Sequence, residues 1–158
     1  MKRPAIRHIT NIMTIGLMFF VFAPANAQNQ DDVKAVEAAA NNYLLGFYEG
    51  KPELLEKVLS PELKKLGWWR PNKDEDYQGP FYISKEESLE FAPRYAAGQN
   101  LPSTAYRKIT VFEVLDKTAV VKAEAVWGVD YLHLAKIDDQ WLIYNAIWQS
   151  WPDGNERK

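Results

Sequence analysis

The spacing of apolar residues changes once along the chain, and this change separates a helical first part from a β-rich second part. From Asp31 onward, apolar side chains recur three and four positions apart, at Val33, Val36, Ala40, Tyr43, Leu44 and Phe47. This spacing predicts an amphipathic helix that Asp31 or Asp32 can cap. Glycines at positions 46 and 50 loosen its far end.

Two further helices are predicted before the pattern changes. A short one begins near Pro52, which suits a first helical turn, and ends at Ser60-Pro61. The capping-box sequence Ser84-Lys85-Glu86-Glu87 predicts another helix from about residue 85 to residue 92, ended by Pro93. Residues 63–70, with the pair Trp68-Trp69, fit no single element, and residues 72–79 are typical of a loop.

The last third of the chain contains four β-rich runs, at residues 106–115, 118–127, 131–137 and 141–148. Short turn sequences separate them: Asp116-Lys117, Gly128-Val129 and Asp138-Asp139. This spacing predicts three tight hairpins and an antiparallel meander. Helices followed by strands predict an α+β fold, in which N-terminal helices pack on a curved antiparallel sheet.

The N-terminus has the three parts of a secretory signal peptide: a basic start, an apolar run over residues 12–23 and the sequence Ala25-Asn26-Ala27. The apolar run is shorter than the about 20 residues that span a bilayer. We expect residues 1–27 to be removed, leaving a domain over residues 28–152 and a flexible tail over 153–158. The mature protein would then be periplasmic or extracellular; an uncleaved N-terminal anchor is the alternative.

Composition removes several kinds of chemistry. The chain has no cysteine, which excludes disulfides, thiolate metal sites and a cysteine nucleophile. Two histidines in 158 residues argue against a two-histidine metal site. A net charge of −2 gives no reason to expect a nucleic acid or an anionic membrane as partner. No nucleotide or dinucleotide fingerprint is present, so no metal and no cofactor is expected.

Two stretches resemble a known superfamily. The sequence Gly50-Lys51-Pro52-Glu53-Leu54-Leu55, followed by Ser60-Pro61-Glu62-Leu63, resembles the opening of nuclear transport factor 2-like domains. Residues 130–145, DYLHLAKIDDQWLIYN, are similar to the branch of that superfamily labelled putative lumazine-binding. The resemblance covers about residues 32–151. It implies a cystatin-like cone, formed by a curved sheet and three helices around a pocket, that often dimerises through its sheet.

Two-residue turns in all three hairpins would fix which side chains share a face. The core face would then hold Phe112, Val114, Val121, Ala123, Leu132, Leu134, Trp141, Ile143 and Ile147. The outer face would hold Glu113, Lys122, Glu124, Tyr131, His133, Tyr144 and Trp148. On this register His133 is a packed or interfacial imidazole rather than a catalytic base, since Asp130 falls on the opposite face.

Polar residues gather at one end of the predicted core face. They are Tyr106, Lys108, Trp127, Asp130 and Asn145, and they form the candidate ligand-binding site. Polar groups that converge on an apolar concave surface are typical of a small-molecule pocket. The alternative is that this end opens to solvent, with Lys108 and Asp130 as an ordinary ion pair.

Three functions therefore compete. The first is an exported, non-catalytic domain that binds a small, partly aromatic molecule. The second is an enzyme of the ketosteroid-isomerase or dehydratase kind, with Asp130 as the weak candidate for its base. The third is a dimeric interaction module whose pocket is vestigial. A homodimer is expected through the outer face, where Tyr131, Tyr144 and Trp148 would align with Val120 and Ile137.

Overall fold

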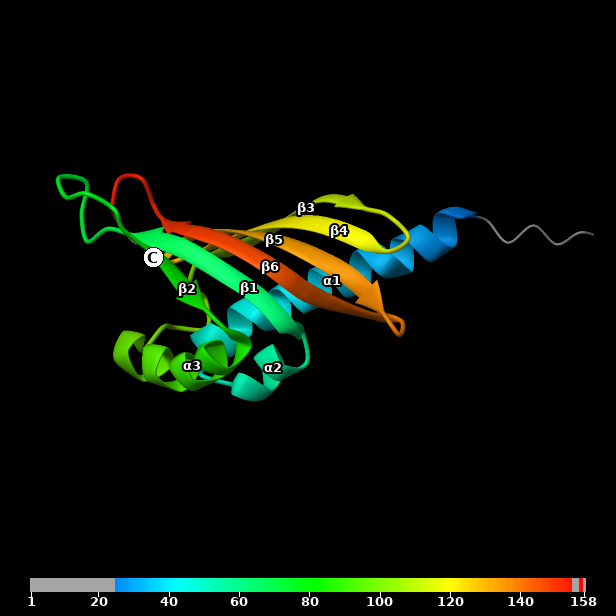
Figure 1. The fold of residues 1–158 in the computed structure, drawn as a ribbon, viewed down its shortest axis with the longest axis horizontal. Coiled ribbons are helices and arrows are strands. Elements are labelled where there is room, and N and C mark those ends of the chain that lie inside the picture. Colours follow the sequence, from blue (N-terminus) through cyan, green and yellow to red (C-terminus); the bar gives the residue numbers. More distant parts are fainter. Residues whose placement is uncertain (1–24, 155–156, 158) are drawn as a thin grey trace, which may run out of the picture.

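Three helices lie on one side of a single curved sheet of six strands (Figure 1). The computed structural model describes residues 25–154 and residue 157. The elements are α1 (Ala25–Tyr48), α2 (Pro52–Glu56), β1 (Leu59–Trp69), β2 (Gln78–Ile83), α3 (Lys85–Gln99), β3 (Arg107–Val114), β4 (Thr118–Ala125), β5 (Gly128–Ile137) and β6 (Gln140–Ser150). The predicted signal peptide lies outside the described residues except for its last three, so its cleavage stays a prediction.

The α+β fold is confirmed, with one difference in the sheet. The strand order is β2-β1-β6-β5-β4-β3, and β1 runs parallel to β6 while every other pair is antiparallel. The sheet is mixed because residues 63–69 of the ambiguous stretch belong to β1, the strand that runs parallel to β6. None of the helices in the described part of the chain is long and apolar enough to cross a membrane.

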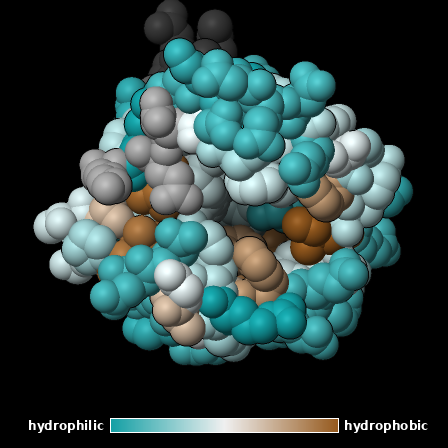
Figure 2. Space-filling view, turned by 90° about the vertical axis from the view of Figure 1, so that its left-hand side faces the viewer, coloured by the Kyte–Doolittle hydropathy of each residue, from teal (hydrophilic) through white to brown (hydrophobic). Residues whose placement is uncertain are grey.

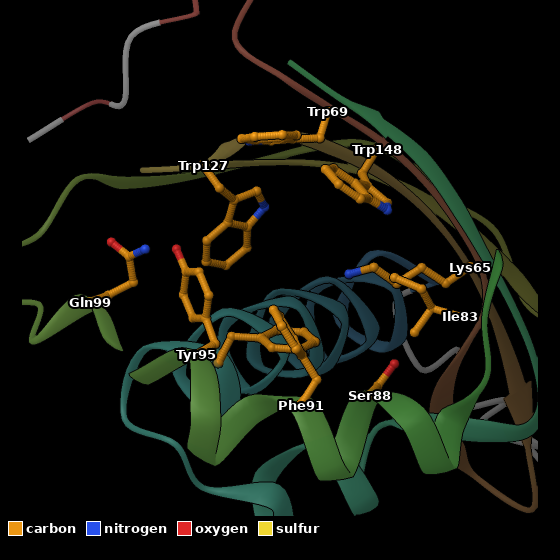
Figure 3. A pocket seen from close by; sticks show the side chains of 10 residues that line it. Lys65, Trp69, Ile83, Ser88, Phe91, Tyr95, Gln99, Trp127 and Trp148 are labelled. Carbon is orange, nitrogen blue, oxygen red and sulfur yellow. The ribbon is translucent and has the colours of Figure 1, made fainter. Parts of the chain in front are cut away.

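The predicted stop at Pro93 is wrong, because α3 continues through this proline to Gln99. The capping box at Ser84 forms as expected, and Asn100 ends the helix in a left-handed conformation with its N–H bonded to the Ala96 carbonyl. A proline inside a helix removes one hydrogen bond, and here the buried Ala92 continues the packed face beside it. The seven extra residues, almost two turns, place Tyr95 and Gln99 beside the sheet (Figure 3).

β2 was missed because Gly79-Pro80 is typical of a loop. The strand lies at the edge of the sheet, pairing with β1 alone. A proline is tolerated there because its missing N–H need not bond to a neighbouring strand.

A bulge corrects the predicted β3–β4 register. The turn at Asp116-Lys117 forms, but Phe112 has no partner on β4, so Lys108 pairs with Glu124 instead of Ala125. Counted away from the turn, one unpaired residue moves every side chain beyond it to the other face of the strand. Lys108 therefore lies on the outer face, and Phe112 is 57% exposed rather than part of the core.

The β4–β5 turn is also displaced from its predicted place. Ala125 pairs with Gly128, so the turn residues are Val126 and Trp127 instead of Gly128 and Val129. The turn lies two residues earlier than predicted, so each residue of β4 pairs with a β5 residue four positions earlier than predicted. Because four is an even number, the predicted faces of β4 and β5 are unchanged. Asp130 stays on the inner face, fully buried.

β6 contains a second bulge. The turn at Asp138-Asp139 forms as predicted, but Leu134 pairs with Ile143 while His133 pairs with Asn145. The extra residue, Tyr144, reverses the faces of everything after it. Asn145 and Ile147 therefore point outward, and Trp148 lies on the inner face opposite Asp130.

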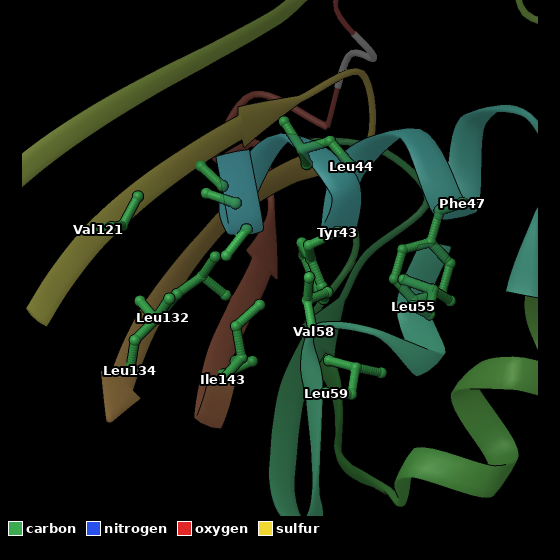
Figure 4. Close-up of a cluster of buried hydrophobic side chains, with 14 of the residues drawn as sticks. Tyr43, Leu44, Phe47, Leu55, Val58, Leu59, Val121, Leu132, Leu134 and Ile143 are labelled. Atoms are coloured by element: carbon green, nitrogen blue, oxygen red, sulfur yellow. The ribbon is translucent and has the colours of Figure 1, made fainter. Parts of the chain in front are cut away.

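The core fills the space between α1, α2 and the inner face of the sheet (Figure 4). Its fully buried large side chains include Tyr43, Leu44, Leu55, Leu59, Leu132 and Ile143. The chain's end also touches this body. Within the predicted flexible tail, the Arg157 N–H donates to the Val126 carbonyl at 3.0 Å, and its guanidinium lies over the Trp151 ring.

Candidate functional site

A pocket of about 380 Å³ lies between α3 and the inner face of the sheet. It is lined by Phe47 from α1, Lys65 and Trp69 from β1, Ile83 from β2, Ser88, Phe91, Tyr95 and Gln99 from α3, Trp127 from the β4–β5 turn and Trp148 from β6 (Figure 3). Figure 2 shows the hollowed face, where hydrophobic side chains lie inside a mostly hydrophilic rim. We call this space the main pocket.

A buried polar cluster lies beneath it. The Tyr43 hydroxyl donates to Asp130 Oδ1 at 2.7 Å, and the Trp127 indole N–H donates to Oδ2 at 2.9 Å. Lys65 Nζ lies 3.5 Å from Oδ1 and also donates to the Tyr43 hydroxyl oxygen. Both carboxylate oxygens of Asp130 therefore have partners, which a buried carboxylate requires.

Burial and the Asp130 charge act together on the pKa of Tyr43 and oppose each other on the pKa of Lys65. Burial raises the pKa of the Tyr43 hydroxyl well above its usual range, and the neighbouring Asp130 carboxylate raises it further. Tyr43 is therefore a neutral hydroxyl at physiological pH. Burial lowers the pKa of the Lys65 ammonium, while Asp130 opposes that shift. Of the two charged side chains in this cluster, Lys65 and Asp130, only Lys65 lines the main pocket.

Aromatic contacts hold the walls. The Trp127 ring meets the rings of Tyr48, Tyr95 and Phe47 edge to face, with centroids 5.3, 5.5 and 5.9 Å apart. Because its N–H is also bonded to Asp130, this indole is fixed at both ends.

Trp148 forms the opposite wall and lies directly against Gly67. A Cβ at residue 67 would come 2.2 Å from Trp148 Nε1, so only glycine leaves room for the ring. The Trp148 indole N–H is buried and has no hydrogen-bond partner within the described residues.

The structure brings together two of the five predicted site residues, Trp127 and Asp130. Tyr106 is half-buried and packs on Trp151, with ring centroids 6.2 Å apart, outside the main pocket. Lys108 is exposed on the outer face, 3.9 Å from Glu124, so its predicted pairing with Asp130 is wrong.

Asn145 is also displaced from the predicted site, because of the bulge at Tyr144. Its amide donates to the Lys64 carbonyl at 2.9 Å, and its oxygen lies 3.2 Å from His133 Nδ1. The outer-face position predicted for His133 is confirmed. That imidazole is exposed, and none of the ion pairs within the described residues includes it.

Several lining residues were missed by the sequence reasoning. Lys65 lies in the stretch that fitted no element, although Leu63, Lys65, Gly67 and Trp69 alternate as one face of a strand. Phe91 belongs to the predicted helix, but nothing in the sequence set its face. Of the Trp68-Trp69 pair, Trp69 is a pocket wall rather than core. No group of residues suited to a metal ion occurs in the described part.

Comparison with solved structures finds the same fold in several bacterial proteins. A nuclear transport factor 2-like protein of unknown function from Silicibacter pomeroyi DSS-3 aligns with a TM-score of 0.61 at 13% identity, covering 77% of this chain and 98% of that one. One from Methylobacillus flagellatus KT gives 0.56 at 18% identity, over 77% and 93%. A "putative scytalone dehydratase" from Novosphingobium aromaticivorans gives 0.54 at 14% identity, over 80% and 88%.

These likenesses show the fold alone. No curated protein sequence matches the chain. A family model does match, over residues 31–149, which include all the strands except the last residue of β6 and all the residues that line the main pocket. The chain belongs to the family described as "Putative lumazine-binding" and has the fold of nuclear transport factor 2-like proteins.

Proposed function

We propose that the exported protein, beginning at Gln28, binds a small, largely aromatic molecule in the main pocket without transforming it. The observation that carries this proposal is the lining: six aromatic side chains surround a space of about 380 Å³ that contains one charged group. Planar apolar ligands gain most from such walls, since ring contacts add to the burial of apolar area.

The polar groups at the inner end favour a ligand that carries a hydrogen-bond acceptor. Lys65 donates to Tyr43 and faces Asp130, which leaves donor capacity on its ammonium toward the pocket. The Trp148 indole N–H is a second donor without a partner among the described residues, although it is buried against Gly67. In contrast, the Ser88 hydroxyl already donates to the Ser84 carbonyl at 2.8 Å. We therefore expect an aromatic molecule with a carbonyl or ring-nitrogen acceptor.

Catalysis by Asp130 is the second candidate, and it draws support from two structures of the same fold that are described as a "putative dehydratase" and a "putative scytalone dehydratase". A general base must come within hydrogen-bond distance of the proton that it removes. Asp130 is fully buried, does not line the pocket and already accepts from Tyr43 and Trp127. These contacts favour a structural role for this carboxylate and binding as the function.

The main pocket predicts a difference between two exposed phenylalanines. The neutral probe N-phenyl-1-naphthylamine should bind saturably, with a rise in its fluorescence. Phe91→Ala should weaken this binding about twofold to tenfold, because one aromatic contact is worth about 0.5–1.5 kcal/mol. Phe91 is 45% exposed, so the fold should tolerate its loss.

Phe112→Ala is the matched control for that experiment. Phe112 is 57% exposed at the β3 bulge and is not among the pocket residues. Its removal should leave the dissociation constant of the probe unchanged. Equal effects of the two substitutions, or no saturable binding by the unaltered protein, would refute the proposal.

We also propose a homodimer through the outer face of the sheet. Trp148 no longer contributes, since it faces inward, but Tyr131 and Ile147 pair across β5 and β6 and are 43% and 39% exposed. Ile137, on the same strand as Tyr131, is 44% exposed. Adjacent exposed apolar side chains on one sheet face are typical of an interface.

A charge at the centre of this face should separate the copies. Tyr131→Glu should convert the dimer to a monomer at micromolar concentration in sedimentation velocity, because burying a carboxylate between the copies costs more free energy than burying a tyrosine ring. Leu115→Glu is the control, since Leu115 is 55% exposed just after the end of β3. A monomeric unaltered protein would contradict the proposal.

A further inference from the structure

A second, smaller pocket of about 200 Å³ adjoins the main pocket near the end of β6. It is lined by Trp69, Arg70, Pro71, Trp127, Ser150, Trp151 and Gly154. Trp69 and Trp127 line both pockets, so the two spaces share these side chains as a common wall. Figure 3 shows both rings at the same side of the main pocket. The two pockets are therefore neighbours, and a molecule that reaches from one to the other must pass these two rings.

The charge of Arg70 distinguishes this second pocket. Its guanidinium donates to the Pro152 carbonyl and lies 4.9 Å from the centre of the Tyr77 ring, both uncharged groups. None of the ion pairs formed within the described residues includes Arg70. Its Nε–H is buried and also has no hydrogen-bond partner there. Among the described residues, this half-buried guanidinium lacks the carboxylate that usually accompanies it.

A hydroxyl lies beside it. Ser150 Oγ accepts from the Arg70 backbone N–H at 3.0 Å, and both residues line the second pocket. Within the described residues no acceptor takes the Ser150 hydroxyl hydrogen, so the pocket offers a neutral donor as well as a charged one. A planar guanidinium and a hydroxyl together suit the oxygens of an anionic group.

Lys65 is the cation that lines the main pocket, but its charge is already balanced. Asp130 lies 3.5 Å from it, and the rings of Phe47 and Tyr43 lie 4.7 and 4.9 Å from its ammonium. An anion beside Lys65 would also meet the negative charge of Asp130. The same anion beside Arg70 would meet an unbalanced positive charge.

We propose that the pocket at Arg70 is an anion subsite, and that the ligand is an aromatic acid whose ring system lies in the main pocket. The acidic group, a carboxylate, sulfonate or phosphate, passes Trp69 and Trp127 and binds Arg70 and Ser150. This inference rests on the proposed function and adds the charge of the ligand and the direction in which it lies.

Two probes that share one ring system test it. They are N-phenyl-1-naphthylamine, which is neutral, and 1-anilinonaphthalene-8-sulfonate, which differs by one sulfonate. The two should compete for one site per chain. Arg70→Gln should weaken binding of the sulfonate about tenfold or more, since it removes a charge-assisted hydrogen bond, and should change binding of the neutral probe less than about twofold.

Arg94→Gln is the matched control, because Arg94 is an exposed arginine of α3 that lines neither pocket. It makes the same change in net charge and should leave both affinities unaltered. If Arg70→Gln does not fold, salt supplies a second measurement on the unaltered protein. Raising the salt concentration should weaken binding of the sulfonate and not of the neutral probe.

The outcomes separate the two proposals. Binding of the neutral probe with no effect of Arg70→Gln or of salt on the sulfonate would overturn the anion subsite and leave the proposed function standing. Equal effects of Arg70→Gln and Arg94→Gln would also overturn the subsite. Failure of both probes to bind would overturn the proposed function itself.

Discussion

Replacing Asp130 by alanine is expected to lower the free energy of unfolding by about 3–5 kcal/mol, as measured by urea denaturation. The Asp130 carboxylate is fully buried and accepts from Tyr43 and Trp127 while facing the Lys65 ammonium at 3.5 Å. Its removal leaves two buried donors without an acceptor and one buried cation without its counter-charge. Each of these losses costs free energy because water cannot replace the missing partner.

A double-mutant cycle isolates the charge part of this loss. Lys65→Met removes the cation, so the combination of Lys65→Met with Asp130→Ala should cost less than the sum of the two single substitutions. Asp76→Ala is the control, an exposed loop carboxylate whose removal should change stability by less than about 0.5 kcal/mol. A loss below about 1 kcal/mol for Asp130→Ala would contradict the arrangement described for this cluster.

Gly128→Ala is expected to cost about 3 kcal/mol or more, the other large effect. A Cβ at residue 128 would come 2.0 Å from the Gln149 carbonyl oxygen and 2.7 Å from Ser150 Cα. Both atoms belong to the β6 backbone, so no side-chain rotation relieves the contact. The backbone of Gly128, at φ +154°, is also one that alanine rarely adopts. Thermal and urea unfolding should both show the loss.

Gly98→Ala provides the comparison. Gly98 lies near the end of α3, and no atom lies within 4 Å of the position that its Cβ would take. Alanine is favoured over glycine in a helix, so stability should stay the same or rise by up to about 1 kcal/mol. Similar losses at both glycines would show that the close approach of β5 and β6 does not determine the outcome.

Most of helix α1, the capping box of α3 and the four final strands follow from local pattern and were predictable. The predicted cap at Asp31 or Asp32 is wrong, since α1 already begins at Ala25. In α1 and the capping box the determining residues lie within four positions of one another, so the sequence carries the signal directly. β2 and β1 were not predictable in the same way. Their pairing joins Lys65 to Ile83 and Lys65 to Ala146, contacts between segments far apart in the chain.

The candidate site was predicted only in part because two bulges decide it. Counting forward from the correctly predicted turn at Asp138-Asp139 places Asn145 on the inner face and Trp148 on the outer face. The unpaired residue Tyr144 reverses both positions. The same happens to Lys108 through Phe112. A bulge has no strong local sequence signal in either strand. Asp130 was placed correctly because the turn before it was misplaced by an even number of residues.

The main pocket draws its polar floor and its outer wall from separate segments. Lys65, Tyr43 and Asp130 come from β1, α1 and β5 and are buried, whereas Phe91 and Gln99 of α3 lie at the exposed rim. Substitutions in α3 can therefore reshape what the pocket accepts at little cost to folding. A binder for a new aromatic molecule could be selected from a library confined to the outer positions of this one helix, with the buried cluster kept as an invariant frame.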